Sequence, residues 1–133
     1  MHLKIITHDR IVFDDDVNEI YTKGVDGEFG VLRGHIPIIS ALDIGVTKVV
    51  TNDECKWFTT MGGVFQFKND EATILTDCAE CGEDIDITRA RTAKERAEAR
   101  LAEKSAAIDV KRAEASLARA LARLKVAMVE SEH

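Results

Sequence analysis

The sequence predicts a β + α protein: an N-terminal antiparallel β-sandwich over residues 1–83, followed by a C-terminal antiparallel hairpin of two α-helices over residues 84–133. The positions of the structure-breaking residues divide the chain at this boundary. All eight glycines, the only proline and every aromatic residue precede position 83. The residues after it are rich in Ala, Arg, Glu, Lys and Leu, which are strong helix formers. The two parts are therefore expected to differ in secondary structure.

The first part contains short strand-like segments with turn residues about every ten positions, which is typical of a sandwich or barrel rather than of βαβ units. Turns are expected at Asp26-Gly27, at 52–54 and at 69–70, and Pro37 is expected in a loop because it has no backbone N–H. The glycines at 24, 27, 30 and 34 fit neither GxGxxG nor a P-loop, so tight turns are expected there. The predicted strands are 3–7, 10–13, 17–22, 47–51, 56–60, 64–67 and 73–75.

The second part predicts two helices. Asp84 and Asp86 can accept hydrogen bonds from the first turn of one helix, and Asp109 can cap the other, with Ile108 as its hydrophobic staple and a loop near 103–107. Each helix carries an apolar stripe at helical spacing. The stripes are Ala90, Ala93, Ala97 and Leu101, then Val110, Ala113, Leu117, Leu121, Leu124 and Met128.

An alanine-rich seam buries little apolar area, and hydrophobic stabilisation follows buried area at about 25 cal/mol per Å². The helices also have high intrinsic propensity, so each could persist when separated from the other. The hairpin is therefore expected to open and close, which would make it a two-state element.

Charge is distributed unevenly, although the net charge is −6. Residues 1–82 carry seven Lys or Arg against fourteen Asp or Glu, whereas residues 88–128 carry eleven against five. A basic helical hairpin, here called the arm, on an acidic sandwich body favours an acidic partner or a phosphate ligand for the arm. Nucleic acid fits less well, because the body would be repelled and the arm has no aromatic residue for stacking on bases.

The arginines of the arm recur at helical spacing. Arg89 and Arg96 share a face of the first helix, and Arg112, Arg119 and Arg123 share a face of the second. They could form an ordinary solvated surface. Folding the hairpin would, however, crowd like charges together, which is unfavourable unless an anion lies among them. A polyphosphate bound by several guanidinium groups would fit.

Cys78 and Cys81 form a CxxC, and Cys55 is the third cysteine. A zinc site would need about four ligands, and a thioredoxin-like site would need a βαβ context. Small buried residues near a strand end are the favoured interpretation. His35 lacks a companion for catalysis and is expected in loop packing or docking. Nothing resembles a signal peptide or a membrane span, so a soluble cytosolic protein is expected.

Three motifs, in order along the chain, resemble the epsilon subunit of bacterial ATP synthase. They are the loop string Gly27-Glu28-Phe29-Gly30-Val31-Leu32-Arg33-Gly34-His35-Ile36-Pro37, the glycine pair in Met61-Gly62-Gly63-Val64-Phe65, and Ile85-Asp86-Ile87-Thr88-Arg89-Ala90. Arg33 stands where the family usually has proline. The resemblance covers essentially the whole chain.

The resemblance implies a rotor subunit without catalysis of its own, peripheral to the cytoplasmic face of the cell membrane. The sandwich would pack on the gamma subunit and stand on the c-subunit ring, with Glu28 and His35 as docking residues. The arm would extend into the catalytic alpha/beta head and block ATP hydrolysis through Arg112, Arg119 and Arg123. In the folded state it would bind ATP as a regulatory ligand, with no metal required. The ATP-binding positions that carry over are Glu80, Ile85, Asp86, Arg89, Ala90, Arg96, Arg119 and Arg123.

Three other hypotheses remain open from the sequence. A free-standing nucleotide sensor would bind ATP without associating with gamma. A thiol enzyme would require Cys78 and Cys81. A generic coiled-coil adaptor would tolerate replacement of Asp86 and Arg89 without consequence.

Overall fold

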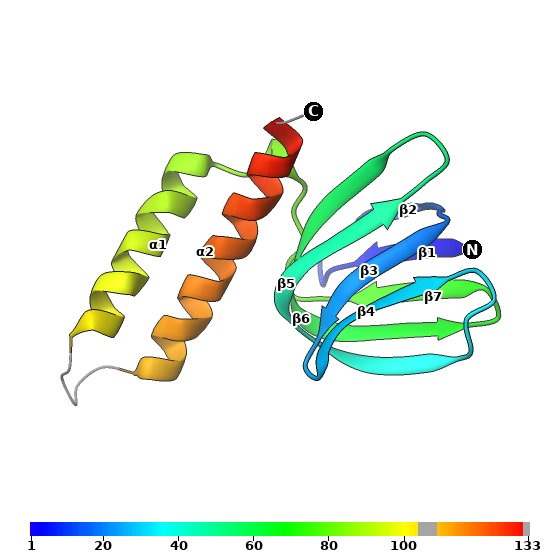
Figure 1. Ribbon diagram of the computed structural model, residues 1–133, viewed down its shortest axis with the longest axis horizontal. Coiled ribbons are helices and arrows are strands. Elements are labelled where there is room, and N and C mark those ends of the chain that lie inside the picture. The colour runs from blue at the N-terminus through cyan, green and yellow to red at the C-terminus, as the bar shows by residue number, and fades with distance from the viewer. Residues whose placement is uncertain (104–108, 132–133) are drawn as a thin grey trace.

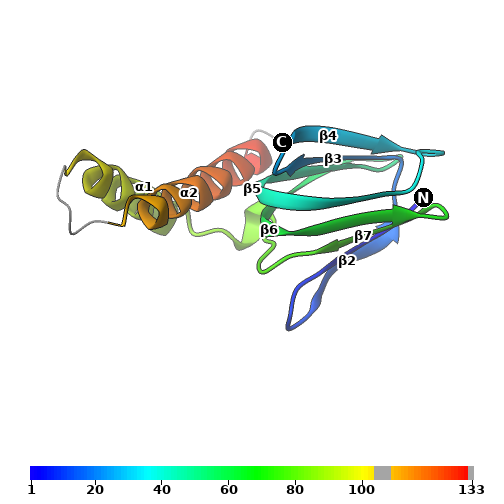
Figure 2. The same cartoon turned by 90° about the horizontal axis from the view of Figure 1, so that it is seen from below.

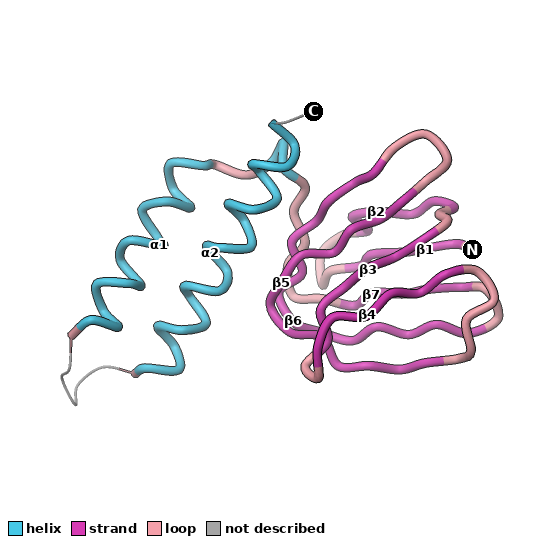
Figure 3. Tube along the Cα trace, in the orientation of Figure 1, coloured by secondary structure: helices cyan, strands magenta, loops and turns pink. Residues whose placement is uncertain are grey.

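The computed structural model describes residues 1–103 and 109–131 and confirms the sandwich followed by two helices (Figures 1 and 3). The expected staple residue Ile108 and most of the expected loop lie outside the described residues. The elements are β1 (His2–Ile6), β2 (Ile11–Asp16), β3 (Glu19–Gly24), β4 (Gly27–Leu32), β5 (Ile38–Val50), β6 (Cys55–Lys68), β7 (Glu71–Leu75), the 3-10 turn η1 (Gly82–Asp84), α1 (Ile87–Ala102) and α2 (Val110–Ser131).

One continuous hydrogen-bonded ladder, in the order β2-β1-β7-β6-β5-β3-β4, folds over to make both layers of the sandwich. Its strand pairs are antiparallel except β1 with β7, which is parallel. The long strands β5 and β6 pass from one layer to the other. At this corner Asp43 and Gly62 are left unpaired in the ladder, and Gly62 and Gly63 have φ values of +78° and +115°. A local bend with positive φ lets two strands change layers together.

The corner explains two differences from the sequence prediction. Segments 56–60 and 64–67 belong to one strand, because the glycine pair bends β6 without ending it. Strand β4 and the first half of β5 were not predicted, because the glycines nearby were interpreted as turns. Gly30 instead lies within β4 opposite Tyr21, where a Cβ atom would come within 2.8 Å of the tyrosine ring. That glycine serves close packing, not a turn.

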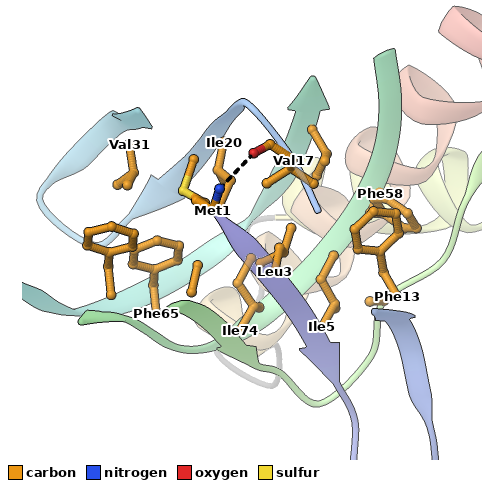
Figure 4. Packing of buried hydrophobic residues seen from close by; sticks show 14 of the residues in the cluster. Met1, Leu3, Ile5, Phe13, Val17, Ile20, Val31, Phe58, Phe65 and Ile74 are labelled. Carbon is orange, nitrogen blue, oxygen red and sulfur yellow. Dashed lines mark hydrogen bonds between the residues drawn. The ribbon is translucent and has the colours of Figure 1, made fainter. Parts of the chain in front are cut away.

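The core lies between the layers and draws on most strands (Figure 4). Phe65, Leu3, Ile5, Ile20 and Ile74 are fully buried. Burial of side chains of this size contributes about 1.5–3 kcal/mol each. The sandwich therefore has its own apolar core, independent of the helices.

Buried threonines tie three strands together inside the sandwich. The hydroxyl of Thr47 lies 2.8 Å from that of Thr22 and 3.1 Å from that of Thr60. Mutual hydrogen bonding satisfies polar groups that would otherwise be costly to bury.

Both expected helix caps are confirmed. The Asp86 carboxylate accepts a hydrogen bond from the backbone N–H of Arg89 at 3.0 Å, and Asp109 accepts one from that of Arg112 at 3.1 Å. The predicted stripe of α2 is partly wrong, since Val110, Leu121 and Met128 are exposed. Among the helix residues whose burial is described, the buried ones are Ala90, Ala97, Ala113, Ala120, Ala122, Val126 and Ala127.

The stripe differs because α2 packs on two sides. It lies between α1 and the sandwich corner formed by β5 and β6, whereas α1 lies on the outer side of α2 (Figures 1 and 2). Alanines allow close approach on both sides. Leucine positions therefore do not identify the buried face.

We expect Gly63→Ala to destabilise the protein far more than Gly34→Ala. Both glycines have positive φ, which costs a side-chain-bearing residue about 1–2 kcal/mol. At Gly34 a Cβ atom meets nothing within 4 Å, whereas at Gly63 it would lie 1.9 Å from the carbonyl oxygen of Leu75. The total loss for Gly63→Ala is therefore expected to be roughly 3 kcal/mol or more. Urea unfolding measures both; equal losses would contradict the corner geometry.

Candidate functional site: an arginine-lined groove

The segment that follows β7 is held against β6 by backbone hydrogen bonds. The N–H of Met61 donates to the carbonyl of Cys78 at 3.1 Å, and the N–H of Thr59 donates to that of Glu80 at 2.8 Å. The Thr59 hydroxyl oxygen in turn accepts from the N–H of Glu80 at 2.9 Å. An isolated bridge between Phe58 and Cys81 continues the pairing. Glu80 is thereby fixed at the sandwich edge, directly before the helices begin.

Glu80 pairs with Arg123 of α2. The Arg123 Nε donates to Glu80 Oε1 at 2.8 Å, and the two side chains are 31% and 24% exposed, respectively. Partial burial alone would lower the pKa of Arg123, but the hydrogen bond and charge of Glu80 outweigh it and raise that pKa. Removing either partner would leave the charge of the other half-buried without its counter-ion, which is costly.

A cavity of about 640 Å³ opens beside this ion pair, between the start of α1 and α2. It adjoins a second cavity of about 340 Å³ further along the helices, and the two share Ala93 and Arg96. We call the two together the arginine groove. The first is lined by Glu80, Asp84, Ile85, Asp86, Arg89, Ala90, Thr92, Ala93, Arg96 and Arg123, and the second by Ala93, Arg96, Ala97, Arg100, Arg112, Ala113, Ser116 and Arg119.

Positive charge in the arginine groove is mostly uncompensated. Of its six arginines, only Arg123 forms a salt bridge with a residue in the described part of the chain. Arg119 donates to the hydroxyl of Ser116 at 3.3 Å, which leaves its charge unpaired. Such a cluster can meet several oxygens of a phosphate chain, because each guanidinium offers a planar fork of donors.

The opposite end of the groove has different chemistry. Ile85 and Ala90 provide apolar surface, and Glu80 and Asp86 provide carboxylates. One oxygen of Asp86 already caps α1, so its other oxygen is the one open to a ligand. The groove is thus polar and acidic at the linker and basic along the helices, which suits a ligand with a heterocycle at one end and phosphates at the other.

The groove brings the ATP-binding positions predicted from the sequence together. Seven of the eight line the first cavity, and Arg119 lines the second. Eight further residues line the groove that were not among the predicted ATP-binding positions: Asp84, Thr92, Ala93, Ala97, Arg100, Arg112, Ala113 and Ser116. Thr92 and Ala93 lie one turn after Arg89, and Arg100 lies one turn after Arg96, so helical spacing could have found them. Asp84 was considered only as a cap.

The two predicted docking residues lie apart. Glu28 is exposed near the start of β4, and His35 is half-buried in the loop after it, with its ring 6.0 Å from that of Phe67 in an edge-on arrangement. Strand β4 is an edge of the sheet. Glu28 also lines a cavity between the sandwich and α2, so the two residues lie toward opposite ends of β4.

All three cysteine thiols are free, and those of the CxxC pair, Cys78 and Cys81, are poorly suited to redox catalysis. Burial, and then the neighbouring Glu80, raises the pKa of Cys78, and burial together with a hydrogen bond to Asp84 raises that of Cys81. A raised pKa keeps the unreactive thiol form at neutral pH. Residues 1–103 and 109–131 contain no group of three or more potential metal ligands. Along those residues, neither helix combines the length and apolarity that crossing a membrane requires.

Comparison with known proteins gives a consistent result. Residues 1–82 match the family model described as ATP synthase, Delta/Epsilon chain, beta-sandwich domain, and residues 83–128 match the long alpha-helix domain of the same chain. The chain is 44% identical to the ATP synthase epsilon chain of Nitratidesulfovibrio vulgaris (strain DP4) over 95% of its own length and 94% of the relative's. It is 42% identical to that of Halalkalibacterium halodurans over 96% of each.

Solved structures share the fold at lower identity. A chain in the Euglena gracilis mitochondrial ATP synthase, a structure of OSCP, F1 and c-ring, matches with a TM-score of 0.79 at 22% identity over 98% of this chain and 80% of that chain. A chain from the Tetrahymena thermophila mitochondrial ATP synthase, central stalk and c-ring, matches with a TM-score of 0.57 at 14% identity over 98% and 96%.

A double-mutant cycle should detect the bond between Glu80 and Arg123. We expect Glu80→Gln and Arg123→Gln to be coupled by about 1 kcal/mol in the free energy of unfolding, because both side chains are partly shielded from solvent. The matched control combines Glu80→Gln with Arg119→Gln, whose charge has no such contact with Glu80. If the control cycle shows the same coupling energy, the specific ion pair is not responsible.

Proposed function

Since the chain belongs to the ATP synthase delta/epsilon chain family, as an epsilon chain, we propose that it is a non-catalytic rotor subunit whose helical hairpin binds ATP in the arginine groove. The observation that carries the proposal is the clustering of unpaired arginines beside the acidic and apolar end of one groove. Charges crowded in this way disfavour the folded hairpin when alone. A polyphosphate reverses that effect by neutralising them.

The groove supports one orientation of the nucleotide. Arg89 and Arg96 on α1 and Arg119 on α2 would meet the phosphates, so one ligand would join the two helices. Asp86, Glu80 and the backbone around Ile85 would face the adenine, and the small side chain of Ala90 leaves room for it. No metal ion is needed for charge balance, since the arginines supply the positive charge.

We further propose that ATP competes with inhibition of the catalytic head. Arg112, Arg119 and Arg123 line the groove in the folded arm and would face acidic segments of the head in the extended arm. The ion pair between Arg123 and Glu80 must break before Arg123 can face the catalytic head. ATP therefore favours the folded state by binding it better than the extended one, and the shift cannot exceed that difference in affinity.

The sandwich would connect the arm to the rotor. We assign gamma and the c-subunit ring as its partners, with the ring lying along the β4 edge past Glu28 and His35. Exposed Ile36 and Ile39 add apolar surface beside His35, which suits a protein contact. In this role the subunit would be peripheral to the cytoplasmic face of the membrane and held there only through the complex.

Calorimetric titration of ATP into the full chain tests the proposed ligand. We expect one-to-one binding, weakened about tenfold by Arg89→Ala and by Arg119→Ala, because each removes a charge-assisted phosphate contact. Neither arginine forms a salt bridge with a described residue, so the hairpin should still fold, which helix content by circular dichroism can verify. Arg10→Ala, on the exposed β1–β2 turn, is the control. Absence of binding, or equal affinity in all variants, would refute the ATP site.

Association with gamma separates a rotor subunit from a free-standing ATP sensor. We expect the chain to form a stable one-to-one complex with purified gamma from the same source, measured by size-exclusion chromatography with light scattering. The complex should survive Arg89→Ala, since the sandwich carries the contact. A chain that binds ATP but never gamma would instead be a sensor.

A further inference from the structure

A second groove lies between α2 and the outer face of the sandwich, whereas the arginine groove lies between α1 and α2. Its cavity measures about 650 Å³, within the range of small-molecule sites. Tyr21, Lys48 and Trp57 line it from the sandwich, and Leu121 and Lys125 line it from α2. It shares no lining residue with the arginine groove.

The floor of this groove is one cross-strand row. Gly30 of β4 is paired with Tyr21 of β3, Tyr21 with Lys48 of β5, and Lys48 with Trp57 of β6. The absent side chain of Gly30 leaves space for the tyrosine ring. The Lys48 ammonium lies 5.9 Å from the centre of the Tyr21 ring and 5.3 Å from that of Trp57. Cation–π contacts thus hold a positive charge above an aromatic surface.

Two observations point to an anionic group as the missing partner. Lys48 and Lys125 form no salt bridge with any residue in the described ranges, although the carboxylate of Glu28 also lines this groove. The indole N–H of Trp57 is buried without an acceptor among the same residues. A buried tryptophan N–H normally has a hydrogen-bond partner. An oxygen anion bound beside Lys48 would provide the missing acceptor and the missing countercharge.

The walls of this groove are apolar, so they favour a ligand that has an apolar body as well as an anionic group. Ile44 and Val46 of β5 line one wall, and Leu121 of α2, which is 45% exposed, lines the other. We propose that this groove binds a small organic anion with an apolar body, its carboxylate beside Lys48 and Trp57 and its hydrocarbon between β5 and α2. Because the ligand would contact both the sandwich and α2, it would favour the packed arm independently of ATP.

Octanoate is a suitable probe, and Trp57, the only tryptophan, reports on the groove by its fluorescence. We expect a saturable change in emission when octanoate is added to the full chain. Lys48→Gln should raise the octanoate Kd about tenfold by removing the charge-assisted contact. The control is Lys4→Gln, an exposed lysine on β1 outside this groove. Circular dichroism checks that each variant is folded.

Matched ligands and a second variant complete the test. Acetate lacks the apolar body and 1-octanol lacks the charge, so both should bind at least about tenfold more weakly than octanoate. Arg89→Ala should leave octanoate binding unchanged, which separates this site from the arginine groove. No saturation by about 10 mM octanoate, a concentration that would detect even millimolar affinity, would overturn the proposal. So would equal affinity for octanol, or for the Lys48→Gln protein.

Discussion

The pairing of residues 78–81 with β6 is the constraint on which the rest of the molecule depends. It extends the sheet past β7 by backbone hydrogen bonds, which hold whatever side chains are present. Glu80 is fixed by this pairing, and Arg123 is fixed by Glu80. The position of α2 follows, and with it the shapes of both grooves. The rigid strand edge therefore sets the packed position of α2, whose own contacts are weak.

The sequence revealed the division of the chain better than the course of the sheet. Helix propensity and the capping aspartates are local signals, so both helices and the positions of Asp86 and Asp109 could be predicted. The role of a glycine is not local. Gly30 packs under a ring, whereas Gly62 and Gly63 bend a strand without ending it, and only the pairing partners distinguish these cases. Strand β4 was missed for this reason.

The arginine groove could also be predicted only in part from the sequence. Spacing of seven and four residues places Arg112, Arg119 and Arg123 on one helix face, but it does not say what that face meets. The contribution of Glu80 arises from long-range pairing and was suggested only by family resemblance. The buried face of α2 was harder still, because alanine occurs all around the helix and fits either neighbour. The groove beside Trp57 has no sequence signature, since four strands and a helix each contribute to it.

The order in which the elements are attached has a consequence for hydrogen exchange. Helix α1 packs chiefly on α2, and α2 packs on the sandwich corner, so each element depends on the next one inward. Local opening should therefore be nested: amides of α1 exchange when α1 alone detaches, those of α2 when the whole arm detaches, and those of the core strands only on global unfolding. The molecule would then have three opening reactions with different free energies. A ligand bound between two elements would raise the opening free energy only of those reactions that separate the two elements.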